Sequence, residues 1–305
     1  MGVLPDAPGT KDDTAPEGVK RTGLFGFSLR ESGLAAAFLA PSLVIFGLFF
    51  YFPFARLVSW GFYESRQRGS FYENVGFSHY VDVLTSSEFL DGLWISVQFV
   101  LLTVPAGLIL GTLLAVAAHR RLKGMKIYQT IFSSTIATSV AVAAVLFFGL
   151  INPAVGVFKV DWLSNPGTAL PALALVAVWK NLGLSFVIVL AGLQAVPDEL
   201  TEAAMIDGYG AIGRFFKVTL PALTPVLTFL VVALTIFGMQ EFALPDIITG
   251  GGPEGSTSTL VYTIAQKLDP TNITDGSVMA VGLFGITLII GLGQFILLER
   301  GMNRD

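Results

Sequence analysis

Six long apolar stretches constrain this chain more than any other feature of its sequence. They cover residues 33–54, 93–118, 127–150, 170–196, 222–243 and 278–298. Each is close to the roughly 20 residues that an α-helix needs to cross the hydrocarbon core of a bilayer. We therefore predict an all-α integral membrane protein in which these six stretches are transmembrane helices.

The composition supports a membrane location. Hydrophobic residues make up 53% of the chain and charged residues 13%, whereas soluble domains carry about 25% charged residues. A net charge of −4 without a long basic run argues against a nucleic-acid partner. Because the chain has no cysteine, disulfides, thiol catalysis and cysteine-ligated metals are excluded.

The residues before the first stretch have a different composition. Residues 1–22 are rich in Pro, Gly, Asp, Thr and Lys, and we expect them to form a disordered cytoplasmic tail. The remainder, residues 23–305, is predicted to be a single six-span domain. The first apolar stretch is long and has no small-residue cleavage site, so we interpret it as a span and not as a signal peptide.

The distribution of Lys and Arg predicts the orientation. The two tails and the loops at 119–126 and 197–221 together hold twelve of them, whereas the loops at 55–92, 151–169 and 244–277 hold five. The positive-inside rule therefore places both termini and the 197–221 loop in the cytoplasm. The longer loops on the other side, rich in aromatic residues, Gly and Pro, could form a docking rim for an outside partner or could be plain connectors.

The loop from Pro197 to Pro221 is polar although it lies between two very apolar stretches. Pro197 can open a helix whose first turn carries two acidic residues, where negative charge complements the helix dipole. Gly208 can form a turn without a steric penalty, and Pro221 is tolerated in the first turn of the next helix. We predict two short helices with a bend between them, which suggests a docking element.

This loop resembles the EAA loop of permease subunits in bacterial ABC importers, whose pattern is E-A-A, three residues, G, nine residues and I-x-L-P. Val218 replaces the Ile of that pattern. The resemblance implies contact with a cytoplasmic ATPase through residues Glu202, Ala203, Ala204, Asp207, Gly208, Leu220 and Pro221. The alternative is an amphipathic helix that only connects two spans.

Further segments resemble the carbohydrate-type permeases, the family of the maltose importer's larger subunit. They are Thr249–Pro253 (TGGGP), Trp179–Asn181 and Ala191–Gln194. The chain lacks the extra N-terminal spans and the large insertion of some maltose permeases, and is more like the compact six-span members. The resemblance implies a second, similar permease chain, two ATPase subunits and an extracytoplasmic solute-binding protein in the bacterial plasma membrane.

Polar residues within the spans are candidates for the solute pathway, because a buried charge costs roughly 2.5–3.5 kcal/mol on insertion scales. Lys180 lies near the middle of the fourth span and is accompanied by Asn181 and Ser185. Either these residues face the pathway, or Lys180 pairs with a carboxylate or carbonyl and fixes helix packing. Gln240 and Glu241, near the outer end of the fifth span, lie among aromatic residues suited to a sugar, although structural or solvated roles are equally open.

No phosphate-binding G-x-x-x-x-G-K-[ST] motif and no catalytic constellation occurs in the sequence. We therefore expect no enzymatic activity and no cofactor on this chain, with ATP and Mg²⁺ bound by the partner ATPase. The predicted function is a permease subunit for import of a sugar or short oligosaccharide. Alternatives are the same role for glycerol 3-phosphate or a phosphodiester, and an ion-gradient-driven secondary transporter.

Overall fold

The structure is a computed structural model that describes residues 29–66, 71–119, 124–158 and 161–302. The predicted tail at residues 1–22 lies outside the described residues. Contacts divide the chain into two units, Met1–Ala55 and Arg56–Asp305. The division falls at the end of the first predicted span.

The first unit contains most of the first span, which continues to Trp60 in the second unit. Helix α1 (Leu29–Phe46) continues through a π-helical turn, η1 (Gly47–Tyr51), into α2 (Phe52–Trp60). Large apolar side chains such as Phe38, Leu43 and Phe49 are exposed, which suits a helix surrounded by lipid. The helical stretch Leu34–Trp60 is long and apolar enough to cross a membrane.

The second unit is largely helical. Its elements in chain order are β1 (Tyr63–Arg66), β2 (Phe71–Asn74), α3 (Ser78–Leu84), α4 (Ser87–Ala118), α5 (Met125–Ser133), η2 (Ser134–Ala137), α6 (Val140–Ile151), η3 (Asp161–Ser164), α7 (Pro166–Ala195), α8 (Asp198–Ile206), α9 (Ala211–Arg214), η4 (Phe215–Thr219), α10 (Leu220–Ala222), α11 (Thr224–Met239), η5 (Pro245–Thr249), α12 (Leu260–Gln266) and α13 (Ile273–Met302).

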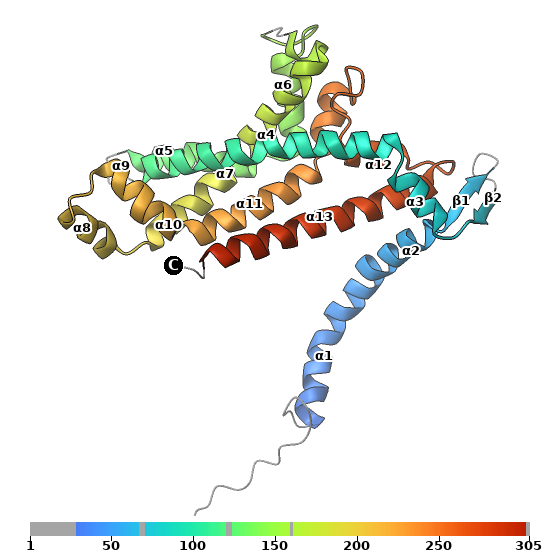
Figure 1. Ribbon diagram of the computed structural model, residues 1–305, viewed down its shortest axis with the longest axis horizontal. Helices are drawn as coiled ribbons and strands as arrows, with labels where there is room; N and C mark the ends of the chain where they lie inside the picture. Colours follow the sequence, from blue (N-terminus) through green and yellow to red (C-terminus); the bar gives the residue numbers. More distant parts are fainter. Residues whose placement is uncertain (1–28, 67–70, 120–123, 159–160, 303–305) are drawn as a thin grey trace, which may run out of the picture. The chain divides into compact units, whose positions relative to one another are not determined.

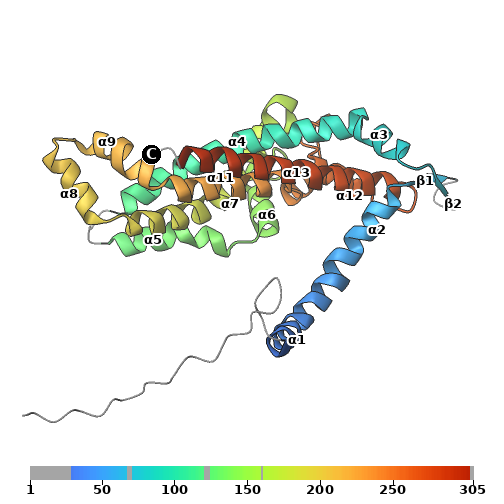
Figure 2. The ribbon, with the colours of Figure 1, turned by 60° about the horizontal axis from the view of Figure 1, so that its bottom comes forward.

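Within this unit α4, α7, α11 and α13 run alongside one another (Figures 1 and 2). The most extensive contact joins α4 and α7. It is close because Gly111 of α4 faces Ser185 of α7: a Cβ added at Gly111 would lie 2.5 Å from the Ser185 Cβ. Small residues at such crossings let helix backbones approach, which is a common way for membrane helices to pack.

Four of the six predicted spans are long helices, and the other two are bent. The long ones are Leu34–Trp60, Ser87–Ala118, Pro166–Ala195 and Ile273–Leu297. The third stretch breaks into Met125–Ala137 and Val140–Ile151 at an angle of 103°. The fifth stretch corresponds to Thr224–Met239, which meets Ala211–Ala222, mostly part of the predicted 197–221 loop, at 68°. The described chain therefore has four spans, or up to six if each bent pair counts as one.

The connections on the α3 and α12 side contain more structure than the loops we predicted. The 55–92 segment includes a short antiparallel hairpin, β1–β2, in which Tyr63 pairs with Asn74 and Arg66 with Phe71. This hairpin is a small β addition to a fold whose predicted all-helical class is otherwise confirmed. The 244–277 segment contains the helical pieces η5 and α12.

Candidate functional site

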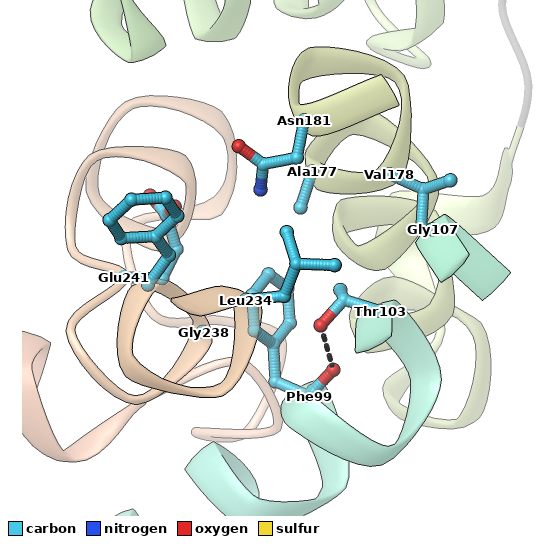
Figure 3. Close-up of a pocket in the computed structure, with 10 residues that line it drawn as sticks. Phe99, Thr103, Gly107, Ala177, Val178, Asn181, Leu234, Gly238 and Glu241 are labelled. Carbon is cyan, nitrogen blue, oxygen red and sulfur yellow. Dashed lines mark hydrogen bonds between the residues drawn. The ribbon is translucent and has the colours of Figure 1, made fainter. Parts of the chain in front are cut away.

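A narrow pocket lies between α4, α7 and the end of α11 (Figure 3). Its volume of about 10 Å³ gives room for about one water molecule. Polar and aromatic side chains share the lining, and the residues are Phe99, Thr103, Gly107, Ala177, Val178, Asn181, Leu234, Phe237, Gly238 and Glu241. Hydrogen-bonding groups beside aromatic rings in a mostly apolar bundle are typical of a binding or passage site.

Two of the predicted pathway residues meet in this pocket. Figure 3 shows Asn181 reaching from α7 into the space between the helices, with Glu241 on the other side. Lys180 does not line the pocket, but it lies close enough to Glu241 for the two charges to interact. Among the described residues Lys180 forms no direct ion pair or hydrogen bond.

Backbone contacts hold Glu241 in place. Its Oε1 accepts a hydrogen bond from the Leu244 N–H at 3.0 Å, and its main-chain oxygen accepts one from Thr259 Oγ1 at 2.8 Å. Thr259 follows the glycine-rich segment 249–253, in which Gly250 and Gly251 have φ of +59° and +81°. The Tyr262 hydroxyl donates to the Gly250 carbonyl oxygen at 2.8 Å. The glycine-rich segment thus forms a compact turn beside the residue that closes the pocket.

The other two predicted pathway residues lie elsewhere. Ser185 is fully buried against Gly111 at the α4–α7 crossing. Its Oγ has no hydrogen-bond partner among the residues that the structure describes. Gln240 is exposed and outside the pocket lining. The structure therefore brings together Asn181 and Glu241, with Lys180 nearby, and separates Ser185 and Gln240 from them.

Sequence reasoning missed the contribution of α4 to this pocket. Phe99, Thr103 and Gly107 are four residues apart, so they share one face of the helix. The Thr103 hydroxyl donates to the Phe99 carbonyl oxygen at 2.8 Å. The sequence does contain a signal for this: the four-residue spacing places the Thr103 hydroxyl on the same helix face as Phe99 and Gly107.

The loop from Pro197 to Pro221 folds into the two short helices that we predicted, α8 and α9. Gly208 ends the first of them with φ of +83°. The Tyr209 N–H donates to the Ala204 carbonyl oxygen at 3.0 Å and the Gly208 N–H to that of Met205 at 3.1 Å. This is a Schellman motif, in which glycine supplies the left-handed residue after the helix. The glycine of the EAA pattern thus has a clear structural reason.

The EAA residues divide between two faces of α8. Glu202 and Ala203 are exposed, whereas Ala204 is 4% exposed and packs inward. Of the two alanines, only Ala203 lies on the outer face of the helix. Pro221 lies in the first turn of α10, as predicted, next to the half-buried Leu220.

Apolar side chains cover the outer surface of this loop. Ile206 is 87% exposed and Ile212 77% exposed, and Leu200 and Met205 are about half exposed. Asp207 and Gly208 are exposed at the turn between them. Large apolar residues gathered on a loop with charged neighbours are typical of a protein docking surface.

Among the described residues, no group of three His, Asp or Glu side chains could hold a metal ion. The pocket is suited to the passage of a solute, and the exposed 197–221 loop is suited to the docking of another protein.

The bundle of long and bent apolar helices, the polar pocket and the exposed loop define a multi-pass membrane transport component. The chain belongs to the family of binding-protein-dependent transport system inner membrane components, whose sequence pattern matches residues 104–299. It is a permease subunit of an ABC importer in the inner membrane and not an enzyme. The predicted membership in the carbohydrate-type ABC importer permeases is confirmed.

Relatives are similar in sequence over nearly the whole chain. The sn-glycerol-3-phosphate transport system permease protein UgpA of Escherichia coli O6:K15:H31 is 31% identical over 281 residues, which cover 88% of this chain and 95% of the relative. The UgpA protein of Shigella flexneri is 30% identical with the same coverage.

Solved structures show the same fold. A chain of a bacterial alginate ABC transporter in complex with an alginate pentasaccharide-bound periplasmic protein matches with a TM-score of 0.76 and 20% identity, covering 90% of this chain and 96% of that one. A bacterial ABC transporter involved in import of the acidic polysaccharide alginate matches with a TM-score of 0.72 and 21% identity, covering 89% and 96%.

Proposed function

We propose that this permease carries a sugar or short oligosaccharide into the cytoplasm. The observation that supports this solute class is the pocket lining, in which Thr103, Asn181 and Glu241 provide hydrogen-bonding groups beside Phe99 and Phe237. Sugar hydroxyls pair with amide, hydroxyl and carboxylate groups, and sugar C–H faces pack on aromatic rings. The pocket described here is too small for a sugar, so passage requires α4, α7 and α11 to separate.

A second candidate solute is glycerol 3-phosphate. The relatives named for transport of that compound are 30–31% identical to this chain, and Lys180 could attract a phosphate. However, Lys180 lies outside the pocket lining, and its charge interacts with that of Glu241, which is in the lining. The charge balance around the pocket therefore favours a neutral solute.

The proposed partners are a second permease chain, two cytoplasmic ATPase subunits and a solute-binding protein outside the membrane. ATP and Mg²⁺ bind the ATPases, and this chain binds no cofactor. Both termini and the 197–221 loop lie in the cytoplasm, in agreement with the excess of Lys and Arg on that side. There the exposed apolar residues of α8 and α9 face water, and a docked ATPase would cover them.

Coupling then follows from the geometry of the loop. The Schellman motif at Gly208 fixes α8 relative to α9, and α10 leads directly into α11. Movement of the ATPases would thereby be transmitted to α11, whose far end is followed by Glu241. Rigid-body motion of packed helices is an established way to switch a cavity between two openings.

The solute class can be tested by competition. The complex is reconstituted in liposomes with its binding protein, and ATP-driven uptake is measured for a panel of radiolabelled neutral sugars and for glycerol 3-phosphate. We expect uptake of a neutral sugar that excess glycerol 3-phosphate does not reduce. Uptake of glycerol 3-phosphate alone would establish the second candidate instead.

A further inference from the structure

His79 of α3 joins three parts of the fold in one buried contact. Its side chain is 6% exposed. Nδ1 lies 3.0 Å from the carbonyl oxygen of Gly61, which follows α2, and Nε2 lies 3.0 Å from Oδ1 of Asp275, in the first turn of α13. The end of α2, α3 and the start of α13 therefore meet at a single imidazole.

Both partners of this imidazole are hydrogen-bond acceptors. A carbonyl oxygen can only accept, and an ionised carboxylate also only accepts. The Asp275 side chain is 37% exposed, so water solvates its negative charge. A neutral imidazole has one N–H and can satisfy only one of the two contacts, whereas the imidazolium ion satisfies both. The geometry is one in which only the protonated imidazole can donate from both nitrogens.

Acidic side chains surround the imidazole. Four carboxylates line the pocket of about 360 Å³ beside the imidazole: Glu64 of β1, Asp82 of α3, Glu88 of α4 and Asp275 of α13. One of these carboxylates, Glu88, is paired with Lys267, whose ammonium group lies 2.8 Å from Glu88 Oε2. Burial raises the pKa of the neighbouring Tyr80, which therefore stays neutral, and its hydroxyl donates to the Val58 carbonyl oxygen at 2.8 Å.

The His79 contact is connected through α13 and α11 to the pocket that Asn181 and Glu241 line. Helix α13, which carries Asp275 in its first turn, packs against α11, and Gln294 Nε2 of α13 donates to Thr235 Oγ1 of α11 at 3.0 Å. Helix α11 in turn contributes Leu234 and Gly238 to the pocket and is followed by Glu241. A change at the start of α13 therefore reaches the solute pathway through two packed helices.

We propose that His79 is a proton-operated latch that holds α3 against α13 in the conformation described here. When His79 is protonated both contacts are made. When the pH rises and the proton is lost, the neutral imidazole can donate to only one of its two acceptors. The junction at which the end of α2, α3 and α13 meet then keeps one hydrogen bond of the two and is weakened. On the proposed function and orientation, His79 lies on the outer side of the membrane, so import responds to the pH outside the cell.

The latch can be tested by distance measurement, because the cysteine-free chain accepts engineered labels without background. Spin labels are placed at Val81→Cys in α3 and Leu288→Cys in α13, two side chains that are both 49% exposed. The labelled permease is studied in its full complex in lipid nanodiscs from about pH 5.5 to about pH 8.5, which brackets the ordinary titration range of histidine. We expect the population with the longer distance to rise about tenfold across this range.

Three variants sharpen the test. His79→Gln should show the longer distance at every pH, and Asp275→Asn, which keeps an acceptor but loses the charge, should shift the transition to lower pH. His119→Gln, which replaces the other histidine, should behave like the parent. A distance that does not depend on pH in the parent would overturn the latch. So would a pH response that persists in His79→Gln, or a transition in Asp275→Asn at the same pH as in the parent.

The functional consequence is measured separately as ATP-driven uptake at the same external pH values. We expect uptake to vary with external pH in the parent and to lose that dependence in His79→Gln. Because the distance measurement requires no transport, a complex without ATP-driven uptake at any pH would contradict the proposed function. An uptake that ignores external pH while the distance changes would overturn the regulatory part of the latch.

Discussion

The hydroxyl oxygen of Thr135 accepts a hydrogen bond from the backbone N–H of Gly183 at 2.9 Å, inside the buried contact between the bent third span and α7. A Cβ added at Gly183 would lie 2.3 Å from that oxygen and 2.9 Å from the Phe132 carbonyl oxygen. The bent third span therefore packs on α7 at Gly183, two residues beyond Asn181. The following predictions test this contact, the EAA loop, the pocket and the loop before α13.

Gly183→Ala should destabilise the complex, because the added methyl group has no space and its nearest neighbours include backbone atoms. Overpacking of this kind costs about 1–3 kcal/mol. Gly149→Ala in α6 is the matched control, since a Cβ there meets nothing within 4 Å and alanine favours a helix. Thermal unfolding in detergent measures both, and equal melting temperatures for the two variants would contradict the packing described here.

Thr135→Val should lose the hydrogen bond to Gly183 while keeping the size of the side chain, whereas Thr135→Ser keeps the hydroxyl. We expect Thr135→Val to lower the stability by about 1 kcal/mol and Thr135→Ser to recover part of the loss. Thermal unfolding of the three proteins gives the comparison. A serine variant no better than the valine variant would show that the hydroxyl is unimportant.

Gly208→Val should break coupling. The space around Gly208 is open, but its φ of +83° is unfavourable for a β-branched residue. Gly208→Asn is the control, because asparagine tolerates the left-handed conformation. Binding-protein-stimulated ATP hydrolysis by the complex should fall about tenfold or more in the valine variant, since such strain costs roughly 1–2 kcal/mol. It should largely remain in the asparagine variant, and equal activities would contradict the turn's role.

Asn181→Leu should raise the KM for uptake about tenfold, the effect of losing one hydrogen bond to the solute. Gln240→Leu serves as the control, because Gln240 is exposed and does not line the pocket. Its KM should stay within about twofold of the parent, as expected for a surface position. A larger effect of Gln240→Leu than of Asn181→Leu would move the pathway away from this pocket.

Asp269, in the loop before α13, should not contribute to any pH response between pH 5 and pH 9. Its side-chain hydrogen bond with Asn272, together with those from Thr271, lowers the pKa of this carboxyl group from 3.8 to about 2. Because the folded pKa is depressed, its stabilising effect is present above pH 3.8 and is lost only as the pH falls through about 2. Asp269→Ala should therefore lower the melting temperature equally at about pH 5.5 and about pH 8.5. An unequal shift would assign part of the pH response to this loop.

The features that the sequence predicts well are local ones. Glycine at position 208 is needed for a left-handed turn, and proline at position 221 fits a first helical turn, so both could be inferred without tertiary contacts. Apolar length likewise identified the four long spans. The bend at Thr138–Ser139 was missed, because average hydropathy conceals a break that depends on Ser139 Oγ accepting from the Val142 N–H at 3.2 Å.

Only some residues of the pocket could be predicted from the sequence, for a related reason. Asn181 and Glu241 attract notice as polar groups in apolar stretches, but Thr103 becomes part of the pocket only because α4 packs on α7. Ser185 carries the same chemical signal as Asn181, yet the close approach of Gly111 turns it into a packing residue. Helix rotation and packing decide which polar group faces a pathway. Neither can be inferred from the spacing of residues within one span.

The most direct test of the account is whether transport by this chain requires ATP hydrolysis by its partners. Purified permease is reconstituted in liposomes alone, and in parallel with its co-purified partner chains and binding protein, and sugar uptake is measured with ATP or with an ion gradient. We predict ATP-dependent uptake only by the full complex, lost in Gly208→Val. Uptake by the isolated chain on an ion gradient without ATP would contradict the account.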